Sequence, residues 1–252
     1  MCSSSPNINY MKIHLFIAFV LLTTAPTPWA LTFNDSITAI FGAGNPDTGW
    51  TSDTNNNFEL GLRGKNRDTG ATPNDGAGTY TFALGTNVNW EFSINSDVAG
   101  APGPSAGRSL LDYNFRLSID TDPSAAQSFF PPFNPVTAYG DNSLGDNSTA
   151  NGAGVETGPA SSGIHNIAQN SQRIFFFPLS ANQNANGTYD FLLAAYDLQD
   201  AAFERPLAQT AMRINIGEGG RAVPDSGTTL ALFTLALAGM AAFGLRRSAA
   251  AF

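Results

Sequence analysis

Apolar and polar residues alternate along most of the middle of the chain, with the period of two that is typical of half-buried β-strands. Between the two ends, no window of a dozen residues keeps helical spacing. Seven segments are therefore predicted to be strands. They cover residues 58–62, 80–84, 88–94, 113–119, 174–177, 189–196 and 208–216.

These segments predict an all-β domain over residues 31–216, an antiparallel β-sandwich of immunoglobulin-like or jelly-roll-like type. Residues 80–84 and 88–94 flank a Gly-Thr-Asn turn, which predicts a hairpin with one face in solvent. The run at 174–177 is continuously apolar and is ended by Pro178. The segments between the strands are rich in Gly, Asn, Asp and Ser, which suit turns, and long loops are expected at residues 42–57, 64–78, 99–107 and 141–163.

The first 30 residues have the pattern of a secretory signal peptide. Lys12 supplies a positive charge, residues 13–22 form an apolar run, and Ala30 is a small residue at which cleavage frees Leu31. The apolar run is too short to span a bilayer stably. Met11 heads a compact signal by itself and is a candidate for the true start. The alternative to a signal peptide is that these first residues form a buried N-terminal core helix.

The C-terminus contains a second apolar segment. Residues 228–245 carry no charge and span about 27 Å as a helix, which predicts one membrane crossing. Arg246 and Arg247 follow at once and are predicted to stop the chain on the cytoplasmic side, leaving the body outside. Directly before the helix stands Val223-Pro224-Asp225-Ser226-Gly227, and residues 217–222 are predicted to be a linker. In this group the proline cannot continue a helix from upstream, and the aspartate or serine can cap the first turn.

This order of motif, helix and arginine pair resembles the PEP-CTERM class of bacterial sorting signals. The residues Val223-Pro224-Asp225-Ser226-Gly227 resemble its VPDSG-CTERM variety, and the whole signal covers residues 223–252. The resemblance implies that an exosortase, an integral-membrane Cys protease, recognises the motif and removes the helix. The protein then passes to the cell surface or to an extracellular polysaccharide matrix. The alternative is a plain membrane anchor in which the motif occurs by coincidence.

A second resemblance concerns the body of the chain. Residues 186–197 read NGTYDFLLAAYD and resemble the penultimate strand of immunoglobulin-like extracellular modules. That resemblance implies that the Tyr189 hydroxyl bonds back to an upstream turn, as in a tyrosine corner. It supports a fold and implies no activity.

Charge and composition narrow the function classes. The chain has 12 basic and 20 acidic residues, a net charge of −8 and a pI near 4.5. This is the wrong sign for a surface that neutralises phosphates, so nucleic acid is excluded as an expected partner. An acidic exterior suits a matrix protein, and it opposes tight binding to acidic polysaccharide unless a cation bridges the two.

The inventory of reactive side chains argues against an enzyme. Cys2 precedes Met11, and His165 is the only histidine after the signal peptide, so Cys–His catalysis and a multi-histidine zinc site are excluded. His165 is expected to be a loop residue without a role. Glycoside hydrolysis by two carboxylates stays open as an alternative, since it needs only a pair of acids.

Other candidate ligands have two interpretations each. One set of side chains either offers hard oxygens to Ca²⁺ or forms Asx-turns. The set consists of Asp120, Asp122 and the Asp-Asn pairs at 141–142 and 146–147. Trp50 is a candidate platform for sugar stacking, or is partly buried, whereas Trp90 is predicted to be core. The apolar run at 129–133 is expected to cover a sheet edge or to meet a partner.

We therefore predict no catalytic residue, no metal ligand and no cofactor. The predicted function is that of an exported, exosortase-processed protein of the cell surface or extracellular matrix, with a structural role in biofilm. Its expected partners are signal peptidase, the exosortase, the membrane as a transient anchor, and exopolysaccharide. The alternatives are a carbohydrate-binding or adhesion module assisted by calcium, and a secreted glycan hydrolase.

Overall fold

A computed structural model describes residues 31–42, 45–100 and 108–220. The predicted signal peptide, the sorting motif at 223–227, the apolar segment at 228–245, and Arg246 and Arg247 all lie outside the described residues. Within the described part of the chain, no helix is long and apolar enough to cross a membrane.

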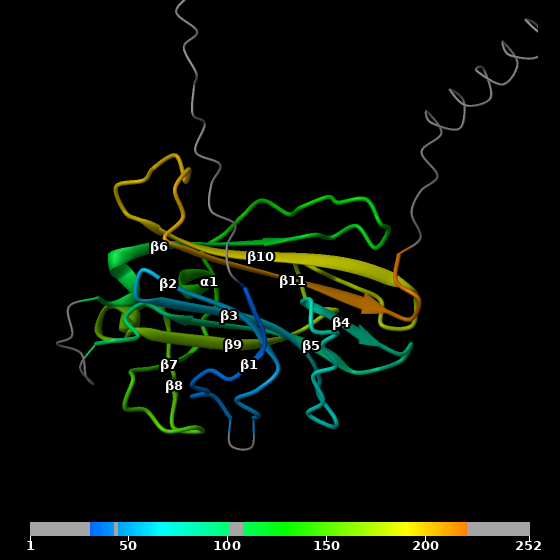
Figure 1. The fold of residues 1–252 in the computed structure, drawn as a ribbon, viewed down its shortest axis with the longest axis horizontal. Helices are drawn as coiled ribbons and strands as arrows, with labels where there is room; N and C mark the ends of the chain where they lie inside the picture. Colours follow the sequence, from blue (N-terminus) through cyan, green and yellow to red (C-terminus); the bar gives the residue numbers. More distant parts are fainter. Residues whose placement is uncertain (1–30, 43–44, 101–107, 221–252) are drawn as a thin grey trace, which may run out of the picture.

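The described residues form two β-sheets that pack face to face (Figure 1). The seven-stranded sheet has the order β1-β2-β3-β5-β9-β7-β8, and the four-stranded sheet has the order β4-β11-β10-β6. The strands of the larger sheet are β1 (Thr32–Asp35), β2 (Trp50–Asn55), β3 (Phe58–Asn66), β5 (Val88–Asn95), β7 (Ser143–Gly145), β8 (Val155–Glu156) and β9 (Ile167–Arg173). Those of the smaller sheet are β4 (Thr79–Phe82), β6 (Tyr113–Ile119), β10 (Gly187–Asp197) and β11 (Ala208–Ile216). The helices described are short: α1 (Pro135–Ala138), η1 (Leu110–Asp112) and η2 (Pro159–Ile164).

The all-β prediction is confirmed, but the sheets are not purely antiparallel. β4 pairs in parallel with β11, with Arg213 opposite Thr79 and Ile216 opposite Phe82. The predicted hairpin of β4 and β5 is therefore wrong, because the two strands belong to different sheets. The turn that follows β4 is held to another part of the chain, where the Gly85 N–H donates to the Gln183 carbonyl at 2.8 Å.

The apolar faces of both sheets meet in one core. Period-two alternation places Phe58, Leu60 and Leu62 of β3 on the inner face, and all three are fully buried. Trp90 of β5 is 1% exposed, and its ring lies 5.5 Å from that of Phe191 on β10 in the opposite sheet. The prediction that Trp90 belongs to the core is thus confirmed.

The sequence predictions misplaced one strand of the larger sheet and missed four others. β1 was not predicted, β2 lies within the expected loop at 42–57, and β7 and β8 lie within the expected loop at 141–163. Residues 174–177 were expected to form a strand, but they form turns in which Phe176 N–H donates to the Arg173 carbonyl at 3.0 Å. The strand is instead β9, directly upstream, which pairs with β5 through residues that are mostly polar. Gln169 and Ser171 of β9 lie on the polar outer face of this sheet, opposite Ser93 and Glu91. Asn170 lies opposite Phe92 on the inner face, where its side chain donates to Asp141 and Asn142.

The outer face of the seven-stranded sheet is covered by the chain between β1 and β2, residues 36–42 and 45–49, which we call the cover segment. Ile37 and Phe41 of this segment form a small second core with Trp50. Asn89, Glu91 and Ser93 on the outer face of β5 are all buried. The prediction of a face in solvent is therefore wrong for this strand, because the cover segment excludes water from it.

β10 is the penultimate strand, as the immunoglobulin-like resemblance implied. The layout of seven and four strands differs from the four and three of immunoglobulin constant domains. Tyr189 is buried, but no hydrogen bond between described residues involves its hydroxyl. The tyrosine-corner role is thus not seen in this part of the chain.

Candidate functional site

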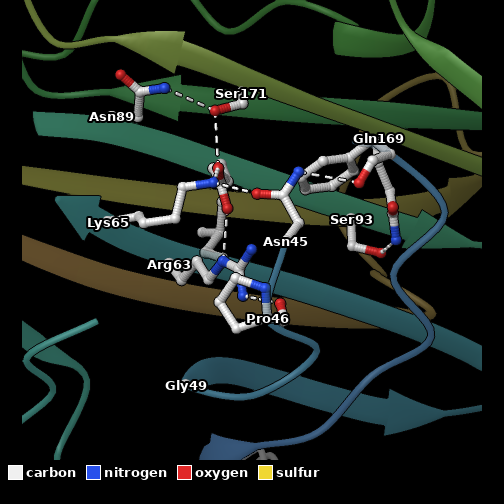
Figure 2. Close-up of polar contacts among 12 residues, drawn as sticks. Asn45, Pro46, Gly49, Arg63, Lys65, Asn89, Ser93, Gln169 and Ser171 are labelled. Atoms are coloured by element: carbon white, nitrogen blue, oxygen red, sulfur yellow. Dashed lines mark hydrogen bonds and ion pairs between the residues drawn. The ribbon is translucent and has the colours of Figure 1, made fainter. Parts of the chain in front are cut away.

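Three charged side chains are buried together between the seven-stranded sheet and the cover segment (Figure 2). Arg63 on β3 and Glu91 on β5 are register partners, and the Arg63 Nε atom lies 2.5 Å from Glu91 Oε2. Lys65, two residues further along β3, forms an ion pair with the other carboxylate oxygen of Glu91. Ser171 of β9 donates to the same oxygen at 2.7 Å and accepts from Asn89. Glu91 therefore has partners on both oxygens, as a buried charge requires.

The charged cluster fastens the cover segment to the sheet. Arg63 Nη1 donates to the carbonyls of Pro46 and Thr48, the latter at 2.9 Å. Lys65 donates to the side-chain oxygen of Asn45. Because the guanidinium group and the ammonium group are each shared between Glu91 and the cover segment, the ion pairs and the segment stabilise one another.

Gln169 of β9 provides a second attachment for the cover segment. Its side-chain oxygen accepts from the Ile40 N–H at 2.8 Å, and its amide nitrogen donates to the Thr38 carbonyl at 2.7 Å. The same nitrogen donates to Ser93 on β5 at 2.9 Å. Gln169 is fully buried, so these bonds replace water around its amide group.

Trp50 lies in this buried layer and is not a sugar-stacking platform. Its side chain has no exposed surface, and the Arg63 guanidinium carbon lies 4.1 Å from its ring centroid. Phe41 meets the same ring edge-on, with 6.4 Å between the centroids. Because Trp50 is buried, it cannot provide the stacking surface on which the carbohydrate-binding alternative depended. The charged cluster around it is likewise closed to ligands and serves to hold the cover segment.

An open cavity of about 490 Å³ contains two carboxylates that sequence reasoning did not single out. Glu59 of β3 and Asp47 of the cover segment both line it. Burial raises the pKa of the Glu59 carboxyl to about 7, and the negative charge of Asp35 adds to the increase. A carboxyl group with such a pKa can exchange protons near neutral pH. In the sequence, Glu59 looked like any polar residue of an alternating strand, so no local signal distinguished it.

The first calcium candidate has internal partners. Asp120 Oδ1 accepts from the backbone N–H groups of Asp122 and Ser128 at 3.1 and 2.8 Å. Asp122 accepts from the Ser124 N–H, and hydrogen bonding by Ser124 lowers the pKa of the Asp122 carboxyl. These are the Asx-type turns that the alternative interpretation predicted.

The repeated Asp-Asn pairs are also structural. Asn142 donates to the carbonyls of Pro135 and Val136 and accepts from Asn170 at 2.9 Å. In the second copy, Asn147 accepts from Asn166 at 3.1 Å and donates to the Asp97 carbonyl. Each copy therefore ties its loop to β9 or to the residue just before it. Within the described ranges, no three His, Cys, Asp or Glu side chains gather as a metal site would require.

His165 lies at the end of η2 and is partly buried. Its backbone carbonyl accepts from the Leu110 N–H, whereas its Nδ1 atom has no hydrogen-bond partner in the described structure. No described residue therefore orients the ring as a catalytic base requires.

Phenylalanines form an apolar surface beside the four-stranded sheet. Residues 129–133 run along the edge strand β6 through bridges of Phe129 to Asp120 and of Phe133 to Leu117. The prediction that this run covers a sheet edge is confirmed. A cavity of about 250 Å³ opens between Phe130, Phe133, Tyr139 and Phe177, and burial raises the pKa of the Tyr139 hydroxyl.

The sorting motif itself lies beyond Gly220, but the residues from which it departs are described. Gly217 N–H donates to the Phe82 carbonyl, and Gly220 N–H donates to Thr188 Oγ1 at 2.7 Å. The chain therefore leaves the body beside the end of β4 and the start of β10 (Figure 1).

Comparison with known families identifies this last part of the chain. Residues 222–247 match the family model of the VPDSG-CTERM motif, so the chain carries a C-terminal sorting signal. The match confirms the motif at 223–227, and it implies export, surface association and processing by an exosortase-type membrane enzyme. No curated protein and no solved structure matches the chain.

Proposed function

We propose that this chain is a non-catalytic structural protein of the cell surface or extracellular polysaccharide matrix. The observation that carries the proposal is the VPDSG-CTERM match over residues 222–247. In this proposal, signal peptidase releases the N-terminus, residues 228–245 anchor the chain in the membrane for a time, and the exosortase cuts near residues 223–227. The β-sandwich then remains outside the cell as the mature product.

Features of the body support a structural role. Its most deeply buried charges, Arg63 and Glu91, hold the cover segment to the sheet. The asparagines of its repeated loops are used in internal hydrogen bonds. The polar side chains that looked most like ligands therefore stabilise loops, which suits a domain that has to persist without a disulfide outside the cell.

The proposal is tested by the intact mass of the protein from membrane and matrix fractions of its native host. We expect the wild type in the matrix fraction to lack the residues after about position 223, and the P224A/D225A variant to keep them and stay in the membrane. Glu218→Ala is the matched control, because it removes an exposed carboxylate just outside the motif. Retention of the C-terminal segment in all three proteins overturns the proposal.

A second candidate, a secreted glycan hydrolase, is favoured by one observation. Glu59 and Asp47 line the same open cavity, and the Glu59 carboxyl has a pKa of about 7, which suits a general acid. Hydrolysis of host exopolysaccharide by the wild-type protein, lost in Glu59→Gln and kept in the exposed-site control Glu156→Gln, would establish this function. If the wild type does not hydrolyse the exopolysaccharide, the glycan hydrolase function is excluded.

A further inference from the structure

Large apolar side chains are exposed at the end of the sandwich where β4 and β11 finish, on the right in Figure 1. We call this set the apolar end. Its members, with their exposed fractions, are Leu84 (53%), Phe175 (39%), Phe176 (48%) and Phe177 (74%). Such a concentration of exposed aromatic rings is uncommon on a soluble monomer and marks a surface that meets another apolar phase.

The loops that carry these side chains are joined to one another and to the chain exit. Leu84 lies against Gly217, so close that a Cβ atom on that glycine would come within 3.0 Å of it. The neighbouring Gly85 is hydrogen-bonded to Gln183, in the loop that follows Phe177. The ring of Phe177 in turn lies 5.2 Å from that of Phe130.

The length of chain beyond the exit limits how far this end can lie from a membrane. Seven residues, 221–227, separate Gly220 from the apolar segment at 228–245. Fully extended, the eight Cα steps from Gly220 to residue 228 reach at most about 28 Å. If residues 228–245 cross the bilayer, the apolar end, which adjoins the chain exit through Leu84 and Gly217, lies within reach of the bilayer.

The cavity beside Phe177 fits lipid chemistry. Its volume of about 250 Å³ is lined by Phe130, Phe133, Ala138, Tyr139, Phe177 and Pro178. Its lining is apolar apart from the Tyr139 hydroxyl, which is itself buried. An open apolar space of this kind can take up a segment of an acyl chain.

The net charge of the chain favours apolar contact with the lipid over electrostatic attraction to it. The chain has a net charge of −8, which gives no long-range pull towards anionic lipids. Arg173 places its guanidinium carbon 5.3 Å from the ring of Phe175, where it can reach a lipid phosphate while its stem stays on the ring. The surface therefore suits a zwitterionic phospholipid interface.

We propose that, before processing, the apolar end rests on the phospholipid surface, with Phe176 and Phe177 inserted among the headgroups. This inference rests on the proposed function, since it requires residues 228–245 to be in the membrane. Docking in this way holds the start of the linker at the bilayer surface and so presents residues 223–227 at the depth where a membrane-embedded protease works.

The test uses the full chain in a Cys2→Ser background, reconstituted in phosphatidylcholine vesicles. A single cysteine, introduced as Phe177→Cys, Leu84→Cys or Leu198→Cys, carries an environment-sensitive fluorophore. Leu198 is the matched control, because it is 47% exposed and follows β10 at the opposite end of the body. Lipids that carry a nitroxide quencher report contact with the bilayer.

We expect quenching at positions 177 and 84 and none at 198. With the label at position 84, the F176S/F177S variant lowers the ratio of quenched to unquenched label about tenfold for each phenylalanine lost. The L198S variant leaves that ratio unchanged.

The remaining outcomes separate the two proposals. A chain that floats with the vesicles but shows no quenching at 177 and 84 overturns docking and leaves the anchor intact. A label at 177 that is shielded from water but not quenched by lipid indicates a second protein copy on this surface, and this also overturns docking. A chain that does not float with the vesicles refutes the membrane anchor, and docking is refuted with it.

Discussion

Glu59 offers a direct test of the electrostatics of the open cavity. Replacement of Glu59 by Gln keeps the shape of the side chain and removes its charge. Its carboxylate makes no hydrogen bond to a described residue, so the substitution breaks none within the described structure. Glu156→Gln, at an exposed position of β8, is the matched control.

The magnitude follows from the pKa. Burial, with the added charge of Asp35, raises the pKa of the Glu59 carboxyl from 4.5 to about 7. The folded chain therefore keeps the group neutral, whereas the unfolded chain ionises it above pH 4.5. The free energy of unfolding falls as pH rises from 4.5 to 7, by about 1.4 kcal/mol per pH unit, to a total of about 3 kcal/mol. This total is an upper limit, because the side chain is partly exposed and solvent screens it.

We expect Glu59→Gln to stabilise the mature chain by up to about 3 kcal/mol at pH 8 and by almost nothing at pH 4. Denaturant unfolding, followed by near-ultraviolet circular dichroism at both pH values, measures the difference. Equal effects at pH 8 and pH 4, or stabilisation of the same size in Glu156→Gln, would refute the reasoning.

Two further predictions concern packing and ion pairs. Arg63→Ala leaves Glu91 buried with fewer partners and frees the cover segment, so we expect a loss of about 3–5 kcal/mol in denaturant unfolding and faster proteolysis between β1 and β2. Asp190→Asn breaks the ion pair with Arg213, whose side chain is 48% exposed, and we expect a change below about 1 kcal/mol in the same assay. A large loss in the second variant and a small one in the first would show that burial does not determine the strength of these pairs.

Much of the fold followed from period-two alternation. It placed the inner-face residues of β3, β5, β6 and β11, because each of these strands has one face in the main core. Alternation could not find β9, whose sequence Ile-Ala-Gln-Asn-Ser-Gln-Arg is dominated by polar residues. Gln169 is favoured by its bonds to Ser93 and the cover segment, and Asn170 by its bonds to Asp141 and Asn142, all of which are distant in sequence.

One error of sequence reasoning arose because the partner of a strand is remote. The chain between β4 and β5 has good turn residues, yet β4 joins β11, which lies more than a hundred residues away. The run Phe175-Phe176-Phe177 looked like a buried strand because its residues are apolar, but it is an exposed turn. The sorting signal was readable because its parts are contiguous and depend on no distant contact.

The place of β11 in the four-stranded sheet sets the order in which the molecule can be completed. β11 lies between β4 and β10 and supplies β4 with its neighbour in that sheet, so β4 lacks a neighbouring strand in that sheet until residues 208–216 are available. A chain made and exported from its N-terminus delivers β11 almost last, immediately ahead of the sorting signal. The pairing of β11 with β4 and the arrival of the sorting signal at the membrane therefore follow directly one after the other. If the signal arrives before β11 has paired, the edge of β4 that β11 later covers is still exposed. Chaperones or proteases can recognise this edge and so distinguish the unfinished molecule from a finished one.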